Sequence, residues 1–372
     1  MKLTAQILLN PTKEQARMLS ETLSVANAAC DEISAFAFGK KVFRKFDLQK
    51  ELYYRIKDTH KLSAQMVVRC LSKVADSYKL DRDKQRTFRK YGSIAYDTRI
   101  LSYKTKSQTV SIWTLQGRQT IPYLVGGHHA ALLAYQQGES DLVFKKGRFY
   151  LLATCEVPED ESEPFVDVIG VDLGIVNILT DSDGDTFSGA SVEQVRQWYS
   201  GRRRVLQSVG TKSAKRRLKQ LSGREAKFKK DTNHKISKQI VQKAKDTKRA
   251  IVLEDLTNIR KRTTVRKEQR SKHGSWAFRE LRMFIEYKAR QKGVVVITVD
   301  PRNTSRTCCK CGHCEKANRK SQSDFVCKKC FHSENADYNA SKNIRNLGAL
   351  SVSPMVSIPA NILRIEKQAP RL

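Results

Sequence analysis

Two Cys-x-x-Cys pairs constrain the fold of this chain more than any other feature of its sequence. Cys308 and Cys311 form one pair, Cys327 and Cys330 form the other, and 15 residues separate the pairs. Six of the nine cysteines fall in this short region, and such bunching favours a metal site over a disulfide framework. The spacing matches a zinc ribbon, in which two knuckles supply four thiolates to one Zn²⁺. Because a site closed by four cysteines leaves no open position, we expect one structural zinc.

Other potential ligands lie beside these four cysteines. Cys309 and Cys314 are additional thiols, and His313 and His332 could each replace a thiolate. The four paired cysteines are preferred because a Cys-x-x-Cys knuckle fits two ligands to one ion. The roles of Cys309 and Cys314 stay open.

Three acidic residues occur at the edges of apolar segments. Asp172 ends the run Val168-Ile169-Gly170-Val171, Glu254 ends the run Ile251-Val252-Leu253, and Asp337 opens an expected helix. A carboxylate in a buried strand costs several kcal/mol unless it is paired or binds a cation. Two neighbouring strands and a nearby helix can bring three such acids together. Their oxygen atoms suit two Mg²⁺ ions, so the sequence predicts a site for phosphodiester hydrolysis.

Each acid also has a simpler interpretation. Asp172 could be a turn residue before Gly174, and Asp337 could be a favourable charge at a helix N-terminus. Glu254 or Asp255 could cap a helix that begins at Leu256. Asp255 is the main alternative to Glu254 as a site residue, but strand alternation should point its side chain to the opposite face.

Positive charge is concentrated in the second half of the chain. The net charge is +32, and residues 196–272 contain 26 Lys and Arg against 6 Asp and Glu. Such density favours a polyanionic partner, with nucleic acid preferred over solvated helix faces or an anionic membrane surface. The candidate nucleic-acid-binding residues are Arg202, Arg203, Arg204, Lys215, Arg216, Arg217, Lys229 and Lys230.

Hydrophobic patterning divides the chain into zones. Residues 1–10 alternate like a strand, and Thr12 with Gln15 resembles the capping box of a helix. Helical spacing continues to about Lys90, and no internal repeat is apparent. Further strands are expected at 109–113, 142–144, 148–153, 166–180, 250–253 and 294–299, a helix at 276–291, and a mobile tail at 349–372.

No uncharged apolar run approaches the roughly 18 residues that a membrane span needs. The first residues also lack a secretory signal pattern. We therefore expect no membrane association and a location in the cytoplasm.

Several of these motifs together resemble the TnpB family of transposon-encoded RNA-guided DNA nucleases, which are related to type V CRISPR effectors. The similar segments are Gly170-Val171-Asp172-Leu173-Gly174, Leu253-Glu254-Asp255-Leu256, Thr304-Ser305, Asp337-Tyr338-Asn339-Ala340 through Asn343-Ile344, and Ser275-Trp276 to Tyr287-Lys288. The resemblance is specific from about residue 166 to residue 347 and looser before that.

The resemblance implies an α/β multidomain chain with an RNase H-like (RuvC) nuclease domain at 165–301 and 332–348. A helical insertion and a target-binding zinc ribbon at 302–331 would interrupt this domain. A wedge-like β-barrel at 1–10 and 91–160, with an inserted helical recognition domain at 11–90, would precede it.

The resemblance also assigns roles to individual residues. Asp172, Glu254 and Asp337 would be the catalytic triad and the Mg²⁺ ligands, and Arg319 could assist near the scissile phosphate or be a solvated loop residue. Phe331 stands where the family often has Gly, so the turn after the second knuckle could differ. The helical lobe has no family match that would assign contacts to a motif flanking the target.

The implied function is RNA-guided DNA cleavage for a transposable element, by a monomer bound to a guide RNA from its own locus and to double-stranded target DNA. Two alternatives share much of this machinery: a guide-dependent repressor that does not cut, and a compact type V CRISPR effector. A strand-transferring transposase is disfavoured. The single-strand transposases of the associated elements use two histidines separated by one hydrophobic residue, together with a nucleophilic Tyr, whereas His128 and His129 are adjacent here.

Overall fold

The computed structural model describes residues 1–174, 176–255 and 278–352. The chain divides into two compact units, residues 1–158 and 159–372. Among the described residues, no helix combines the length and apolar character needed to cross a membrane.

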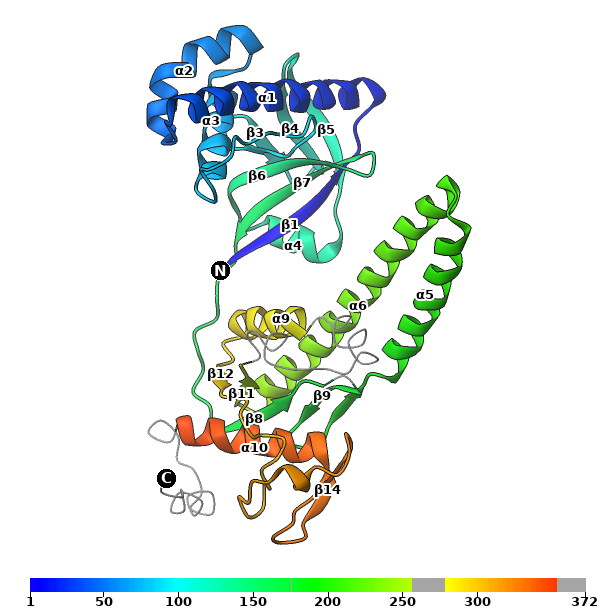
Figure 1. Ribbon diagram of the computed structural model, residues 1–372. Coiled ribbons are helices and arrows are strands. Elements are labelled where there is room, and N and C mark those ends of the chain that lie inside the picture. The colour runs from blue at the N-terminus through cyan, green and yellow to red at the C-terminus, as the bar shows by residue number, and fades with distance from the viewer. Residues whose placement is uncertain (175, 256–277, 353–372) are drawn as a thin grey trace. The chain divides into compact units, whose positions relative to one another are not determined.

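The first unit contains a seven-stranded antiparallel sheet that curls into a nearly closed barrel (Figure 1). β1 (Lys2–Leu9) lies inside this sheet, between β7 (Arg148–Glu156) and β5 (Gly117–Leu124). The predicted pairing of the first segment with the later strands is therefore confirmed. The remaining strands are β2 (Ile94–Tyr96), β3 (Leu101–Lys104), β4 (Thr109–Thr114) and β6 (Gln136–Lys145), and a short helix α4 (Gly127–Leu133) precedes β6.

Three helices follow β1, namely α1 (Lys13–Lys40), α2 (Lys45–His60) and α3 (Ala64–Tyr78). The predicted capping box is present at the start of α1, since Thr12 and Gln15 each accept a hydrogen bond from the other's backbone N–H. The last helix ends at Tyr78, so the expectation of helical structure to about Lys90 was wrong. Local bonds compete with the helix there, because the Asp81 side chain accepts from the Asp83 amide.

The second unit is built on a five-stranded mixed sheet in the order β10-β9-β8-β11-β12. Strands β8, β11 and β12 are parallel to one another, whereas β9 is antiparallel to β8 and to β10. Their bounds are β8 (Asp167–Asp172), β9 (Asn177–Asp181), β10 (Thr186–Ser188), β11 (Arg249–Glu254) and β12 (Val296–Val299). The predicted strands at 166–180, 250–253 and 294–299 are confirmed in outline.

Helices cover both faces of this sheet. Helix α10 (Ala336–Ser351) packs on one face, where Ile344 meets Val168 and Val252. On the other face, the C-terminal part of α6 (Lys212–Asp246) and helix α9 (Phe278–Gln291) pack against Ile169 and Ile251. α10 extends into the region expected to be a mobile tail, and residues 353–372 of that tail lie outside the described residues.

Gly170 allows α10 to lie directly on β8. A Cβ atom at Gly170 would be 2.1 Å from the Ser341 carbonyl oxygen and 2.4 Å from the Arg345 amide nitrogen. Such distances cannot be accommodated without moving backbone, so only glycine permits this approach. The close packing fixes the N-terminal end of α10 near the C-terminal end of β8.

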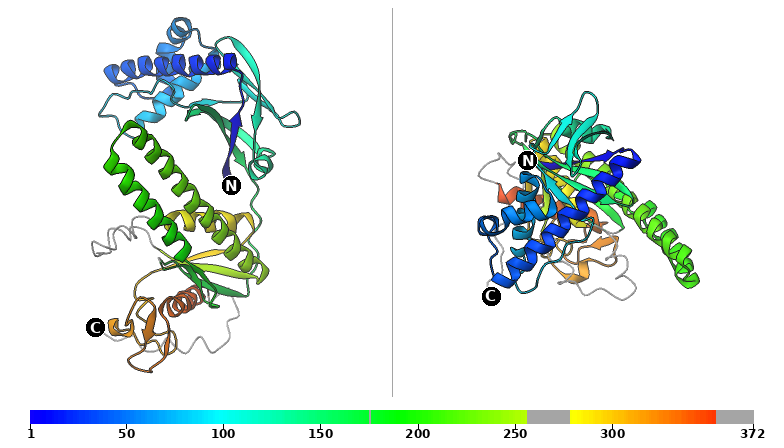
Figure 2. Two further views of the ribbon diagram at one scale, coloured as in Figure 1. Left: turned by 90° about the vertical axis from the view of Figure 1, so that its right-hand side faces the viewer. Right: turned by 90° about the horizontal axis from the view of Figure 1, so that it is seen from above.

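Helix α5 (Ala190–Val209) and α6 form a long antiparallel hairpin in the basic segment (Figures 1 and 2). Gly210 has a φ of 64°, and Thr211 caps α6 by accepting a hydrogen bond from the Ala214 amide. Only Val192 of α5 is buried. The hairpin therefore presents much of its basic surface to solvent.

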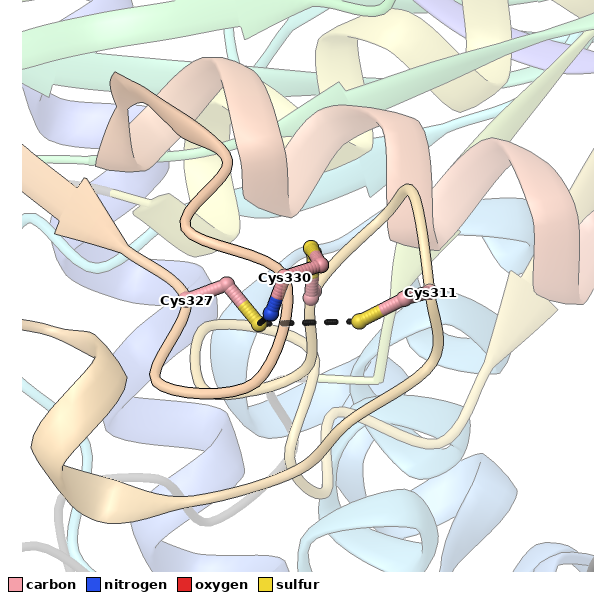
Figure 3. Close-up of side chains that lie close together, drawn as sticks. Cys311, Cys327 and Cys330 are labelled. Atoms are coloured by element: carbon pink, nitrogen blue, oxygen red, sulfur yellow. Dashed lines mark hydrogen bonds between the residues drawn. The ribbon is translucent and has the colours of Figure 1, made fainter.

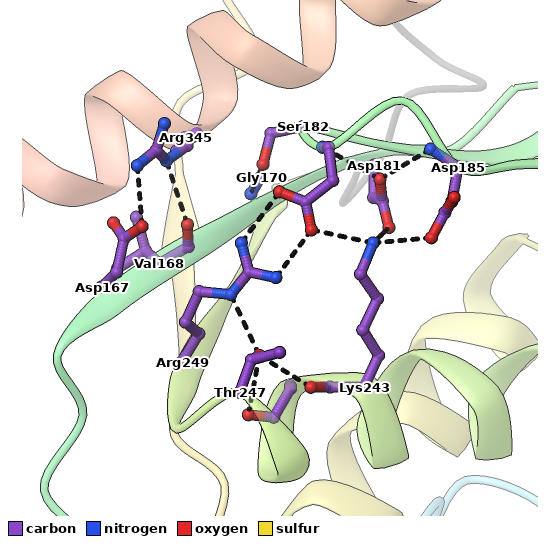
Figure 4. Close-up of polar contacts among 12 residues, drawn as sticks. Asp167, Val168, Gly170, Asp181, Ser182, Asp185, Lys243, Thr247, Arg249 and Arg345 are labelled. Atoms are coloured by element: carbon purple, nitrogen blue, oxygen red, sulfur yellow. Dashed lines mark hydrogen bonds and ion pairs between the residues drawn. The ribbon is translucent and has the colours of Figure 1, made fainter.

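Lys243 of α6 anchors the turn between β9 and β10 (Figure 4). Its Nζ atom lies 2.5 Å from Asp181, 2.8 Å from Asp183 and 2.7 Å from Asp185. Arg249 pairs with Asp183 through two nitrogen atoms. These two cations lower the pKa of Asp183, with its hydrogen bond to Arg249 as the main cause. The cluster fixes α6 to the sheet.

The cysteine region lies between β12 and α10. It contains a short 3₁₀ helix η1 (Lys316–Asn318) and a hairpin of β13 (Asp324–Val326) with β14 (Ser333–Asn335). β14 leads directly into α10. The position of the cysteine cluster is thereby coupled to the start of that helix.

Candidate active site and metal centres

Strand alternation places two of the three predicted acids on the face of the sheet that α10 covers. Asp172 is the last residue of β8 and shares its face with Gly170, while Glu254 is the last residue of β11. The strands are adjacent and parallel, so both acids lie at the same sheet edge. Asp255 is exposed and contacts Arg282 of α9 on the other side, which agrees with its predicted direction.

Asp337 enters the same region from the first turn of α10. The Asn335 side chain caps this helix by accepting from the amides of Asp337 and Tyr338. Asn177 of β9 donates to Asp337 Oδ2 at 3.1 Å. Asp337 is only 8% exposed, so protein groups rather than water make most of its contacts.

Asp172 lies close enough to the other two acids for their charges to act on it. Burial raises the pKa of Asp172 well above its ordinary value, and the negative charges of Glu254 and Asp337 raise it further. Arg319 opposes this shift. Burial also raises the pKa of Glu254. Carboxylates that have an elevated pKa, as Asp172 and Glu254 do, are suited to bind a divalent cation.

The three acids are not packed against one another. Among the residues that the structure describes, only two groups bring three or more potential ligand atoms within 4.8 Å of each other, and both lie in the cysteine region. The three acids are therefore not a compact ligand group of this kind, and they offer only oxygen atoms as donors. This donor set fits hard, water-retaining ions such as Mg²⁺.

Two polar side chains that contact the acids were not assigned roles from the sequence. The Thr304 hydroxyl donates to Glu254 Oε1 at 2.5 Å, and Asn177 contacts Asp337. Thr304 belongs to one of the family-like motifs. No local sequence pattern indicates the role of Asn177, because its contact with Asp337 joins residues 160 positions apart.

Arg319 reaches the acids from the cysteine region. Its Nη2 atom lies 3.4 Å from Asp337 Oδ1 and also donates to the Gln322 carbonyl at 2.9 Å. Its side chain is therefore directed toward the acids.

The four paired cysteines form one cluster, as their spacing predicts. Figure 3 shows three of them, Cys311, Cys327 and Cys330. The Cys308 and Cys330 sulfurs lie 3.6 Å apart, and those of Cys311 and Cys327 lie 3.5 Å apart. Four sulfurs at 2.3 Å from a tetrahedral Zn²⁺ would be about 3.8 Å apart, so the residues fit this ion. Burial raises the pKa of Cys308 and of Cys311, whereas hydrogen bonds from Cys330, Lys329 and Cys311 outweigh burial at Cys327 and lower its pKa to about 6.

The two knuckles have the same turn despite the difference in sequence. The amides of Gly312 and Phe331 donate to the carbonyls of Cys308 and Cys327, respectively. Gly312 has a φ of 74° and Phe331 a φ of 58°. The turn after the second knuckle therefore does not differ as expected. Phe331 instead adopts the left-handed conformation that favours glycine.

The histidines considered as substitutes are not part of the four-cysteine cluster. His313 Nε2 contacts Glu315 at 3.1 Å. His332 lies with Cys309 and Glu334 in the second group of potential ligands.

A groove lies between α5 and α6, and three of the candidate basic residues line it, namely Arg202, Arg216 and Arg217. The groove has a volume of about 740 Å³ and is lined by Trp198, Arg202, Val205, Leu206, Ser213, Arg216, Arg217, Gln220, Leu221 and Arg224. The Trp198 side chain is exposed, and the Arg202 guanidinium lies 5.5 Å from its ring centroid. An exposed aromatic ring among arginines can stack a base and contact phosphates.

The eight candidate nucleic-acid-binding residues differ in their surroundings. Arg203 and Lys229 both pair with the buried Glu225, so part of their charge is already compensated. The other six are exposed: Arg202, Arg204, Lys215, Arg216, Arg217 and Lys230.

Two family models match successive parts of the chain. Residues 153–271 match the family model OrfB_IS605, described as "Probable transposase", and residues 278–344 match the model described as "Cas12f1-like, TNB domain". Transposase-like and Cas12f-like regions thus follow one another in a single α/β chain.

Curated relatives give the same result. A "CRISPR-associated endodeoxyribonuclease Cas12f1" of Sulfoacidibacillus thermotolerans is 28% identical, with 66% of this chain and 60% of the relative covered. A "Putative RNA-guided DNA endonuclease InsQ" of Escherichia coli K12 is 31% identical, covering 54% of each chain. A TnpB-like protein of Methanocaldococcus jannaschii is 32% identical over 40% of this chain and 58% of the relative. These matches span about half to three fifths of the relatives' lengths. They confirm the resemblance to the TnpB family.

Among solved structures, a Cas12f1–sgRNA–target DNA complex aligns with a TM-score of 0.41 and 19% identity. The alignment covers 93% of this chain and 99% of that one.

Proposed function

We propose that this protein is an RNA-guided DNA endonuclease of a transposable element, with a RuvC-like active site formed by Asp172, Glu254 and Asp337. The observation that carries the proposal is the placement of these acids at the ends of β8 and β11 and the start of α10, where burial and the charges of Glu254 and Asp337 raise the pKa of Asp172. The mixed sheet, with helices on both faces, supports an RNase H-like domain at 165–301 and 332–348. The names of the relatives support the nuclease activity.

The chain's own residues define how such a site would work. Asp172, Glu254 and Asp337 would hold two Mg²⁺ ions, which supply charge stabilisation for the attacking water and the leaving oxygen of a phosphodiester. Thr304 would orient Glu254, and Asn177 would orient Asp337. Arg319 would place a positive charge beside Asp337 and the substrate phosphate.

The remaining regions would position nucleic acid. We assign guide-RNA and heteroduplex binding to the exposed arginines and lysines of α5 and α6, with base pairing supplying sequence choice. The barrel (1–10 and 91–160) and the helical domain (11–90) would read a short flanking motif. The ribbon at 302–331, closed by one zinc at Cys308, Cys311, Cys327 and Cys330, would contact the target.

The partners and location follow from this activity. The protein would act as a monomer bound to a guide RNA transcribed from its own locus and to double-stranded target DNA. It would work in the prokaryotic cytoplasm at the nucleoid.

The test is to express the protein from its native locus, sequence the RNA that co-purifies, and assay that complex. The substrate is a DNA duplex complementary to the variable end of the RNA, with randomised flanking sequence and added Mg²⁺. One RNA with a defined 3′ end, together with cutting, supports the proposal. A defined RNA with tight DNA binding but no cutting would indicate the repressor instead.

Two further outcomes separate the remaining possibilities. RNA that derives from a neighbouring repeat array would indicate a compact type V effector. Absence of a discrete RNA would refute guided cleavage and leave a basic nuclease whose targeting is unknown.

A further inference from the structure

A second group of potential metal ligands lies beside the four-cysteine cluster and shares no residue with it. Cys309 Sγ is 2.9 Å from Glu334 Oε1 and 3.8 Å from His332 Nε2, and the two latter atoms are 3.0 Å apart. Three different donor types therefore face one point. The four-cysteine site leaves all three side chains unused.

The backbone at each of these residues is held in place. The Cys309 amide donates to Asn339 Oδ1 at 3.0 Å, and the His332 carbonyl accepts from the Cys327 amide at 2.9 Å. Glu334 is the central residue of β14 and pairs with Phe325 of β13. The group is consequently part of the fold rather than a chance meeting of mobile side chains.

The donor set and its dimensions suit Zn²⁺. A tetrahedral zinc bound at about 2.3 Å to sulfur and about 2.0–2.1 Å to nitrogen and oxygen separates sulfur from the other ligands by about 3.6 Å, and nitrogen from oxygen by about 3.3 Å. The observed separations of 3.8, 2.9 and 3.0 Å come within about 0.7 Å of these values. Small side-chain movements would complete the geometry.

Surrounding residues orient the carboxylate for such a role. Lys342 Nζ lies 2.6 Å from Glu334 Oε2 and so leaves Oε1 directed at Cys309 and His332. An outer partner of this kind is typical of metal-bound carboxylates. The side chains of His332 and Glu334 are 23% and 11% exposed. A metal ion can therefore reach them from solvent, while most water is excluded.

A nucleophilic cysteine triad explains the geometry less well. In such a triad, a histidine uses one ring nitrogen for the thiol and the other for the carboxylate. Here the same nitrogen of His332, Nε2, faces both Cys309 and Glu334. His332 therefore cannot relay a proton between them, whereas one metal ion could bind all three atoms.

We propose that Cys309, His332 and Glu334 form a second zinc site, with three protein ligands and a fourth position for water. The site would brace the ribbon against α10, because Glu334 precedes Asp337 by three residues and Lys342 belongs to α10. This inference extends beyond the proposed nuclease function and does not depend on it, since its test measures metal content.

The experiment compares zinc content in the full-length wild-type chain and three variants, by elemental analysis after gel filtration in chelator-free buffer. The wild-type chain should contain two zinc ions, one of which a chromophoric chelator removes first because its site has three protein ligands. Cys309→Ala and His332→Gln should each contain one. Cys314→Ala is the matched control, since this exposed cysteine of the same region belongs to neither group, and it should retain two.

Cobalt substitution provides a second measurement. In Cys309→Ala, the sulfur-to-cobalt charge-transfer absorption of a four-thiolate site should persist, while the contribution of the mixed site disappears. One zinc per wild-type chain, unchanged in Cys309→Ala, would overturn the proposal. Loss of both ions from Cys309→Ala and His332→Gln alike would also overturn it, because the two groups would then not be separate sites.

Discussion

At the scale of single residues, the candidate active site is defined by charges that the fold brings together at a cost. Burial and the charges of Glu254 and Asp337 all favour the protonated form of Asp172. An elevated carboxyl pKa means that the folded chain binds protons more strongly than the unfolded chain does. The resulting stability is present below the ordinary pKa of 3.8 and is lost as the pH rises through the folded value.

This linkage predicts a pH-dependent difference between two proteins. In Mg²⁺-free buffer, Asp172→Asn should be more stable than wild type near neutral pH, and the difference should shrink as the pH falls toward 4. Urea unfolding at several pH values measures it, without a chelator that would also remove zinc. A constant difference across this range would show that Asp172 carries no elevated pKa.

Phe331 gives a second prediction at this scale. It holds a left-handed conformation and its side chain is 78% exposed, so the strain is not offset by burial. Phe331→Gly should raise the free energy of unfolding by up to about 1 kcal/mol. Thermal unfolding of the zinc-loaded protein measures the change, and Phe331→Ala, which keeps the strain, should show no such gain. Destabilisation by glycine would contradict this explanation.

At the scale of elements, the contact between β8 and α10 determines where Asp337 lies. Gly170→Ala would force a Cβ atom against the backbone of α10 and should cost about 1–3 kcal/mol. DNA cleavage should fall as well, because α10 carries Asp337. Gly201→Ala in α5 is the control. Apart from its chain neighbours and the backbone of its own helix, no atom lies within 4 Å of the added Cβ, so it should stabilise the chain by about 0.5–1 kcal/mol. Equal effects of the two substitutions would contradict the packing argument.

The same scale shows how far the sequence could predict the structure. The acids and the cysteine pairs were recognisable because their residue types and spacing are specific, and β8 and β11 are short continuous apolar runs. No strand is predicted at β5, because Gly117, Gln119 and Pro122 interrupt the alternation of apolar and polar residues. Of the residues of β5, only Ile121 and Tyr123 are buried. Contacts such as Asn177 with Asp337, or Cys309 with His332, depend on tertiary folding and leave no local pattern in the sequence.

At the scale of the whole molecule, the net charge of +32 indicates a polyanionic partner, and the groove of α5 and α6 is where exposed arginines and an exposed tryptophan coincide. Affinity for single-stranded RNA falls with salt concentration in proportion to the number of phosphates that the protein neutralises. Replacing Arg216 and Arg217 together by Gln removes two positive charges, so the slope of log Kd against log salt concentration should decrease by about 1.4. Fluorescence titration at several salt concentrations gives this slope. The matched Lys variant, which keeps both charges, should retain the wild-type slope, and an unchanged slope in the Gln variant would place the RNA elsewhere.

Cleavage by the RNA-loaded protein tests the central proposal most directly. The comparison uses Asp172→Asn, from the candidate active site, and Asp255→Asn, from the opposite face of the sheet. We predict that both variants bind the target duplex as the wild type does, that Asp255→Asn cuts it in Mg²⁺, and that cutting by Asp172→Asn falls by about 10²-fold or more. Undiminished cutting by Asp172→Asn would contradict the assignment of the active site.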